Sequence, residues 1–154
     1  MSEEKSIELT LEQTGEYEFR VRFDGTSIPE MTTDESAPLG SDAGPNPSRL
    51  LTAAVANCLS ASLLFALRKY KNAPDKLAAK ARAVLDRNEH GRWRIQGVKV
   101  DVQLAQAMSS FEHADRVLAQ FEDFCIVTQS VRQGVAVDVT VRDATGAVVH
   151  SSLV

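Results

Sequence analysis

The chain has 154 residues, of which 44% are hydrophobic and 25% are charged, and its formal net charge at pH 7 is −4. This size and composition predict a single globular domain over residues 1–154, with enough apolar side chains for a hydrophobic core. The acidic balance argues against a nucleic-acid-binding protein, because such proteins neutralise phosphates with an excess of lysine and arginine.

The N-terminal part predicts a β-hairpin followed by a long loop. Residues 7–12 and 17–23 alternate apolar and polar side chains, which is the period-two pattern of a half-buried strand, and a Thr-Gly turn lies between them. Residues 24–47 are rich in proline and glycine and predict mainly loop, with a short third strand near residues 30–33. A loop of this length inside a compact domain is often functional.

A long uncharged helix is predicted next. Asn46 can cap its N-terminus, Pro47 suits the first helical position, and the helix should run to about Tyr70 and end before Pro74. Residues 50–67 carry no charge, which is long enough to raise a membrane span. The many alanines and the interspersed hydroxyl and amide side chains favour a helix in a protein interior instead, and no membrane partner is expected. Because the helix is apolar on nearly every side, other structure must surround it.

Two paired strands and a further helix are predicted after the uncharged helix. Residues 76–86 and 92–103 read as strands, and the apolar register slips at Gly97, where a β-bulge is expected. Ser109 followed by Glu112 has the pattern of a capping box at a helix N-terminus.

The C-terminal part predicts more helix and a final hairpin. Apolar residues at helical spacing over residues 111–121 bring the chain to Cys125, and a short helical turn should end at Gly134. Alternating valines over residues 135–141 predict a last long strand, which a turn joins to the apolar residues 147–154. Strands, helix, strands, helix and strands in this order indicate an α+β fold.

Cys58 and Cys125 are the two residues with the clearest chemical potential. The acidic N-terminus lacks the apolar stretch of a secretory signal, so we expect a cytoplasmic protein without a permanent structural disulfide. No Cys-x-x-Cys pair is present, so no metal or other cofactor is expected. The histidines are scattered: His90, His113 and His150. The ordinary alternative is that both cysteines are inert core residues.

A reactive Cys58 would need a group that lowers its pKa. The residue lies well inside its predicted helix, beyond the reach of the dipole at that helix's N-terminus. We therefore expect a nearby cation, and the candidates are Arg20, Arg22 and Arg49. Arg20 and Arg22 lie on the strand face away from the aromatic residues, so the alternative for both is a solvent-facing side chain.

Two segments together resemble the OsmC/Ohr family of organic hydroperoxide reductases: "GPNPSRLLTAAVANCLSASL", which contains Cys58, and "FCIVTQSVRQG", which contains Cys125. The resemblance covers roughly residues 44–141. It implies antiparallel sheets wrapped around a long central buried helix, in an intertwined homodimer with apolar walls at the site.

The resemblance also implies roles for the two cysteines. Cys58 corresponds to the peroxidatic cysteine, which attacks an organic hydroperoxide and becomes a sulfenic acid. Cys125 corresponds to the resolving cysteine, which forms a Cys58–Cys125 disulfide that a dithiol reductant, typically of the lipoyl type, reduces again. The family's activating arginine comes from the N-terminal part, where Arg20 and Arg22 occupy a comparable hairpin.

The chain departs from the family pattern at three positions. Ser48 stands where the reductases have a glutamate after Asn-Pro, Ile126 stands where proline is usual, and Thr128 replaces serine. The glutamate helps to orient the arginine, so its absence leaves a second interpretation open. In that interpretation the protein is a non-catalytic dimer of the same fold, which binds a small molecule or senses oxidation.

Overall fold

The computed structural model describes residues 3–152 and divides them into two compact units. The first unit comprises the chain up to Ala56 together with Lys80–Asp101, and the second comprises Asn57–Ala79 and the chain from Val102 onward. The last two residues of the predicted C-terminal strand, 153–154, lie outside the described residues. A single domain over the whole chain stays a prediction.

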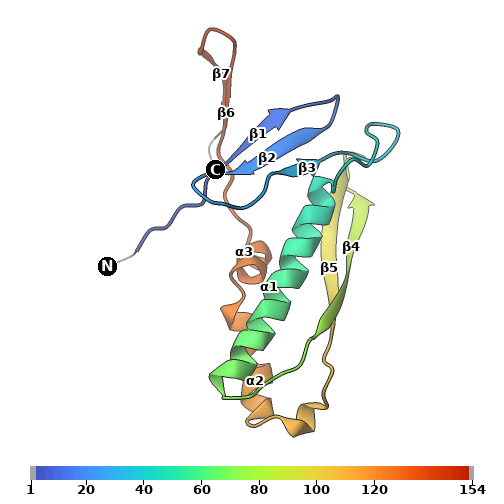
Figure 1. Cartoon of the computed structure of the whole chain (residues 1–154). Helices are drawn as coiled ribbons and strands as arrows, with labels where there is room; N and C mark the ends of the chain where they lie inside the picture. Colours follow the sequence, from blue (N-terminus) through green and yellow to red (C-terminus); the bar gives the residue numbers. More distant parts are fainter. Residues whose placement is uncertain (1–2, 153–154) are drawn as a thin grey trace. The chain divides into compact units, whose positions relative to one another are not determined.

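A three-stranded antiparallel sheet forms the N-terminal part of the first unit (Figure 1). Its strands are β1 (Leu9–Gln13), β2 (Phe19–Phe23) and β3 (Met31–Thr33), with β2 in the middle. Leu11 pairs with Val21, whose side chain is buried. The predicted hairpin and the short third strand are both confirmed.

The loop that follows β3 is organised around the buried carboxylate of Asp34. This carboxylate accepts hydrogen bonds from the backbone N–H groups of Glu35, Ser41 and Ala43 and from the Ser41 hydroxyl, at 2.8 to 3.1 Å. A Cβ atom at Gly44 would lie 2.0 Å from the carbonyl oxygen of Thr32, so only glycine fits there. The long loop predicted from its proline and glycine content therefore has a fixed conformation.

Helix α1 (Pro47–Lys69) begins where the Asn46–Pro47 cap predicts and ends within one residue of the predicted Tyr70. The Arg49 N–H donates to Asn46 Oδ1 at 2.9 Å, which confirms Asn46 as the N-cap. Among the described helices, α1 alone has the length and composition of a membrane span, a test that the core helix of a soluble protein also passes. Only 28% of its most apolar stretch is buried, and the Phe65 side chain is exposed. A single chain therefore covers one face of the helix and not all sides.

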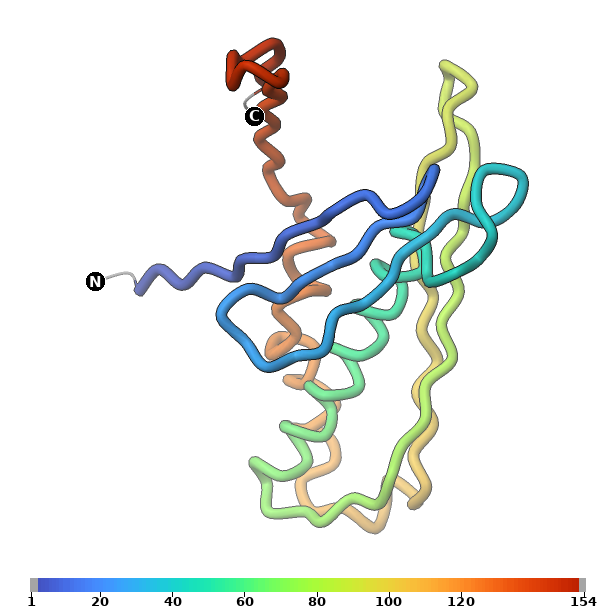
Figure 2. Tube along the Cα trace, turned by 45° about the horizontal axis from the view of Figure 1, so that its top comes forward, coloured from blue at the N-terminus to red at the C-terminus, as the bar shows by residue number. Residues whose placement is uncertain are grey.

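Strands β4 (Ala78–Arg87) and β5 (Trp93–Gln103) form a two-stranded sheet, which Figure 2 shows as a long hairpin in green and yellow. They begin and end within two residues of the predicted positions. The alternation of half-buried and exposed residues along β5 shifts by one at Gly97, where the sequence indicates a bulge. Near the turn, the Arg87 guanidinium stacks 4.4 Å above the Trp93 ring.

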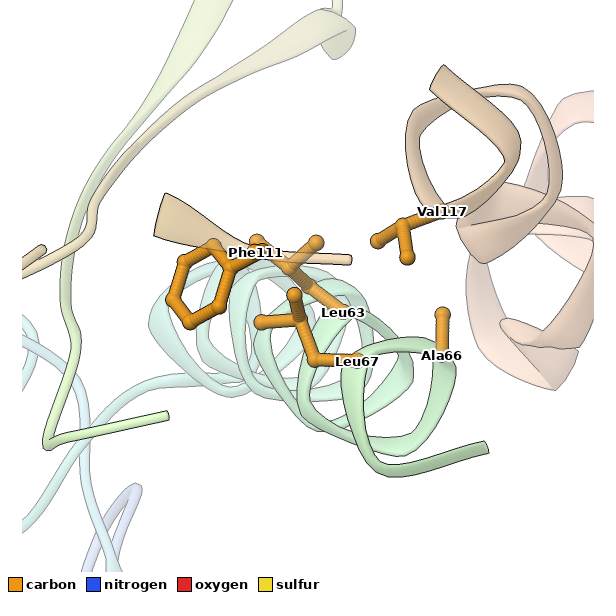
Figure 3. Packing of buried hydrophobic residues seen from close by; sticks show 5 residues of the cluster. All are labelled: Leu63, Ala66, Leu67, Phe111 and Val117. Carbon is orange, nitrogen blue, oxygen red and sulfur yellow. The ribbon is translucent and has the colours of Figure 1, made fainter. Parts of the chain in front are cut away.

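The second unit builds its core from α1 and the helical segments after β5. These segments are η1 (Met108–Ser110), α2 (Ala114–Gln120), η2 (Phe121–Phe124) and α3 (Ile126–Gln133). Figure 3 shows the five buried side chains of this core pointing toward one another. They are Leu63, Ala66 and Leu67 from α1 together with Phe111 and Val117.

The predicted capping box at Ser109 and Glu112 is wrong. Helix α2 starts later, after His113, and no side chain caps it. The Glu112 N–H donates to Asn72 Oδ1 at 2.8 Å, and Asn72 Nδ2 donates to the Glu112 carbonyl at 3.0 Å. These two bonds hold Glu112 outside the helix, so it is not available as a capping residue.

The C-terminal hairpin consists of β6 (Val139–Arg142) and β7 (Val148–Ser152), and every residue in both strands is exposed. The predicted strand over residues 135–141 is therefore too long at its start. Val139 already pairs with Ser152, so the preceding valines have no partner strand within residues 3–152. The α+β fold class is confirmed.

Candidate active site

Cys58 and Cys125 lie in contact within the second unit. Both are free cysteines: Cys58 is half-buried on α1, and Cys125 is fully buried at the N-cap of α3. The two thiols are close enough for each to shift the pKa of the other. Figure 1 shows α3 running beside the middle of α1, which brings two cysteines far apart in sequence together. This contact favours a redox pair over two unrelated core cysteines, because a disulfide needs the two thiols within such reach.

Both sulfur atoms face the N-terminus of α3. The Val127 N–H donates to Cys58 Sγ, and the Thr128 N–H donates to Cys125 Sγ at 3.4 Å. Thr128 Oγ1 lies 3.0 Å from the same Cys125 sulfur. The first N–H groups of a helix carry partial positive charge and lack partners inside the helix, so this end favours an anionic sulfur.

The expectation that a cation acts on Cys58 stays a prediction, but the structure adds a second helix that the sequence did not suggest as a source of donors. The N-terminus of α1 is indeed too far away, but the N-terminus of another helix supplies a donor to Cys58. Cys125 is the N-cap of α3, and its sulfur accepts the Thr128 N–H. Cysteine is not among the residues that favour an N-cap, so the sequence carries no signal for this helix start.

Ser62 is a third member of the site. It lies one turn after Cys58 on α1, its side chain is buried, and it hydrogen-bonds to both sulfur atoms. A hydroxyl in this position can donate to a thiolate on either cysteine. Its position on an otherwise apolar helix does not by itself predict this role.

The two cysteines have pKa values shifted in opposite directions. Burial raises the pKa of the Cys58 thiol above its ordinary value of 9.0, and the hydrogen bond to Cys125 raises it further. Burial also opposes ionisation of Cys125, but hydrogen bonds from the Cys58 thiol and from Thr128 lower the pKa of Cys125.

An apolar pocket of about 380 Å³ lies beside the pair, and Cys58 is part of its wall. The other lining residues are Ala61, Ser62, Phe65, Phe124 and Ile126. The rings of Phe65 and Phe124 meet edge to face, with centroids 5.0 Å apart. Ile126 is 80% exposed, so the pocket is open on that side. The pocket can hold an apolar group next to the Cys58 sulfur, whereas Cys125 has no exposed surface.

The three candidate arginines belong to the first unit, and each has a partner there. Arg20 Nε lies 3.4 Å from Glu30, Arg22 Nη2 lies 3.1 Å from Glu12, and Arg49 Nη1 donates to the Ser36 hydroxyl at 3.1 Å. Arg20 and Arg22 are about half exposed on β2. Activation of Cys58 by either arginine stays a prediction.

One of the three departures from the family pattern has a local structural account. The bond from the Thr52 hydroxyl to Ser48 uses the Ser48 backbone carbonyl, and Ile126 takes the first position of α3, which also suits proline, so nothing in the structure explains these two residues. Thr128 supplies both the N–H and the hydroxyl that face Cys125. Among residues 3–152, histidine, cysteine and carboxylate side chains form no group of three that could hold a metal ion.

Most of the chain matches the model of a known protein family. Residues 40–140 match the family model described as OsmC-like protein. A comparison with curated protein sequences gives no significant match.

Several solved structures share the fold at low sequence identity. An organic hydroperoxide resistance protein from Vibrio cholerae, with captopril bound in one of its active sites, has a TM-score of 0.65 at 20% identity, covering 86% of this chain and 88% of its own. The corresponding protein from Elizabethkingia anophelis has a TM-score of 0.61 at 19% identity, covering 86% and 91%. That of Bacillus subtilis has a TM-score of 0.58 at 20% identity, covering 83% and 91%.

Proposed function

Because this chain belongs to the OsmC-like family, we propose that it is a thiol-dependent peroxidase that reduces organic hydroperoxides to alcohols. The observation that carries the proposal is the contact between Cys58 and Cys125, with Cys58 in the wall of an apolar pocket. The names of several structural neighbours, which are organic hydroperoxide resistance proteins, agree with this activity.

The reaction uses both sulfur atoms. Cys58 attacks the distal peroxide oxygen, the O–O bond breaks, and the alcohol leaves while Cys58 becomes a sulfenic acid. Cys125 then attacks the Cys58 sulfur and displaces water, which leaves a Cys58–Cys125 disulfide. An external dithiol of the lipoyl type reduces this disulfide by thiol–disulfide exchange.

A homodimer in the cytoplasm is part of the same proposal. The C-terminal hairpin exposes Val139, Val141, Val148 and Val149, and the pocket exposes Phe65. Apolar side chains at this density are typical of surfaces that a second copy covers in obligate dimers. A partner chain would also supply the cover that α1 lacks in a single chain.

The direct experiment measures consumption of tert-butyl hydroperoxide by the purified protein with dihydrolipoamide as reductant. We expect turnover by the wild-type protein, none by Cys58→Ser, and a Cys58–Cys125 linked peptide in mass spectra of the oxidised, unreduced protein. Equal peroxide consumption by the wild type and Cys58→Ser would refute the proposal.

A second function is favoured by the raised pKa of Cys58 together with Ser48 in place of the family's glutamate. A cysteine that is mainly protonated attacks peroxide slowly. The protein would then sense oxidation or bind a small molecule, and would not turn over. Stoichiometric disulfide formation without steady-state consumption of peroxide identifies this function.

A further inference from the structure

We propose that Lys69 is a specificity-determining residue, which binds the carboxylate of a hydroperoxide whose apolar chain lies in the pocket beside Cys58. The inference rests on the peroxidase activity proposed above and narrows its substrate to the hydroperoxide of a straight-chain carboxylic acid. A small neutral hydroperoxide can enter the same pocket but has no group for Lys69 to bind.

Helix periodicity places Lys69 on the same face of α1 as the pocket. The pocket wall takes Cys58, Ser62 and Phe65 from this helix. Lys69 follows Phe65 by four residues, and this spacing sets the two side chains one above the other. With a rise of about 1.5 Å per residue, the Cα atoms of Cys58 and Lys69 are about 16 Å apart along the helix axis.

Two aromatic rings connect the pocket with Lys69. Phe65 and Phe124 both line the pocket, and their rings meet edge to face with centroids 5.0 Å apart. The Lys69 ammonium lies 4.9 Å from the centroid of the Phe124 ring. Apolar surface therefore extends from the Cys58 sulfur to a positive charge. An apolar chain that ends in an anionic group matches this arrangement.

The charge of Lys69 has no carboxylate partner in the described part of the chain. Its side chain is exposed, and none of the ion pairs within residues 3–152 includes it. Glu122, close to Phe124 in the sequence, pairs instead with Arg132 at 2.7 Å. Lys69 also lies in the last turn of α1, where a cation stabilises the helix whether or not a ligand binds. An experiment must therefore separate ligand binding from helix stability.

The distance between the two residues sets the length of the chain. Side chains of a helix lean toward its N-terminus, so the Lys69 ammonium can reach back by up to about 6 Å and lie about 10–16 Å from the Cys58 position. A chain with C–C bonds of about 1.5 Å advances about 1.3 Å per carbon, so about ten carbons cover this span. A much shorter acid cannot reach both residues at once.

The first test measures binding without peroxide, so it does not depend on turnover. The reduced protein is alkylated with iodoacetamide in the presence of decanoate, 1-decanol or butyrate, and protection of Cys58 is followed by mass spectrometry. Lys69→Met should raise the decanoate concentration that gives half protection roughly fivefold, the effect of losing one partly exposed ion pair. The value for 1-decanol should stay the same, and butyrate should not protect Cys58.

Two further variants separate the position of the charge from its presence. Lys69→Arg keeps the charge and should keep most of the decanoate protection. Arg68→Met removes an exposed cation from the same last turn, but one that lies about 100° away around the helix, so decanoate protection should not change. A thermal unfolding scan of each variant measures the effect on stability. If Lys69→Met leaves decanoate protection unchanged, or weakens decanoate and 1-decanol equally, the inference is wrong.

The second test measures turnover of two matched substrates. One is a straight-chain acid with the hydroperoxide about ten carbons from the carboxylate, and the other is its methyl ester. Lys69→Met should raise KM for the acid roughly fivefold with kcat unchanged, and should leave both constants for the ester as in the wild type. The same KM for the acid in both proteins overturns the role of Lys69. Decanoate protection that depends on Lys69 without consumption of either substrate supports the carboxylate site and refutes the peroxidase activity.

Discussion

Replacing Ser62 by alanine tests the electrostatics of the cysteine pair most directly. Its buried hydroxyl hydrogen-bonds to both sulfur atoms, and these bonds lower the pKa of each cysteine. Alanine removes the hydroxyl, fits the same space and favours the helix, so α1 should stay intact.

The magnitude follows from the hydrogen bonds that are lost. A hydrogen bond to a charged group contributes about 1.5–3 kcal/mol, and about 1.4 kcal/mol corresponds to one pKa unit. Ser62 has a single hydroxyl hydrogen and can serve only one sulfur at a time, so the lower end applies. We expect the thiolate pKa of the pair to rise by about one unit and the thiolate fraction below that pKa to fall about tenfold.

The assay is the rate of peroxide-dependent oxidation of the pair as a function of pH, with Ser151→Ala on the exposed strand β7 as the control. The Ser62→Ala rate should be about tenfold lower at neutral pH and should return to the wild-type rate at high pH, where the thiolate is fully formed. A rate that is reduced equally at every pH would refute the reasoning, because it would mean that Ser62 supports the geometry and not the charge.

Four further predictions use other parts of the molecule. If Arg20 or Arg22 activates the cysteine pair, replacing that arginine by methionine should slow oxidation of Cys58 by peroxide and raise its thiol pKa. The control Arg142→Met on β6 should change neither. Unchanged rates and pKa values in both Arg20→Met and Arg22→Met would refute the activating role. The N–H of Ser41 and the other donors in its loop lower the pKa of Asp34 below 3.8. The pKa of Asp34 is lower in the folded than in the unfolded protein, so the carboxylate stabilises the fold above pH 3.8, and this stability is lost as the pH falls through the folded pKa. Asp34→Asn should therefore unfold at a lower temperature at pH 7, and its unfolding temperature should depend less on pH in acid. Leu67 is fully buried, so Leu67→Ala should lower the free energy of unfolding by about 3 kcal/mol in urea titration. Analytical ultracentrifugation at micromolar concentration should give a dimer, and a monomer would contradict the proposed assembly.

The elements that the sequence predicts well are those with local signals. The Asn46–Pro47 cap fixes the start of α1, and period-two alternation locates β1 and β2. The capping box at Ser109 failed because Asn72, a residue far away in the sequence, binds Glu112 first. Tertiary contacts of this kind have no local pattern, so propensity alone cannot anticipate them.

The sequence points to the two cysteines of the candidate site but not to the groups that contact them. The paired segments around Cys58 and Cys125 carry the family resemblance, so the partners could be named from sequence. The donor from Val127 to Cys58 joins two helices and depends on how α3 packs against α1. Ser62 lies in a polar strip beside Cys58, but its role could not be predicted from the sequence, because only its contact with two sulfur atoms distinguishes it from the other polar residues of that helix.

The position of Cys125 as the N-cap of α3 links oxidation to helix order. In the reduced protein its sulfur accepts the Thr128 N–H, and a disulfide turns that sulfur into a weaker acceptor. The first turn of α3 then loses its cap, which typically costs about 1 kcal/mol of helix stability. The Thr128 amide should therefore exchange with deuterium several times faster in the oxidised protein than in the reduced one. Ile126, already exposed in that turn, would move with it, so a reductant could recognise the oxidised state by the loosened end of a helix as well as by the disulfide itself.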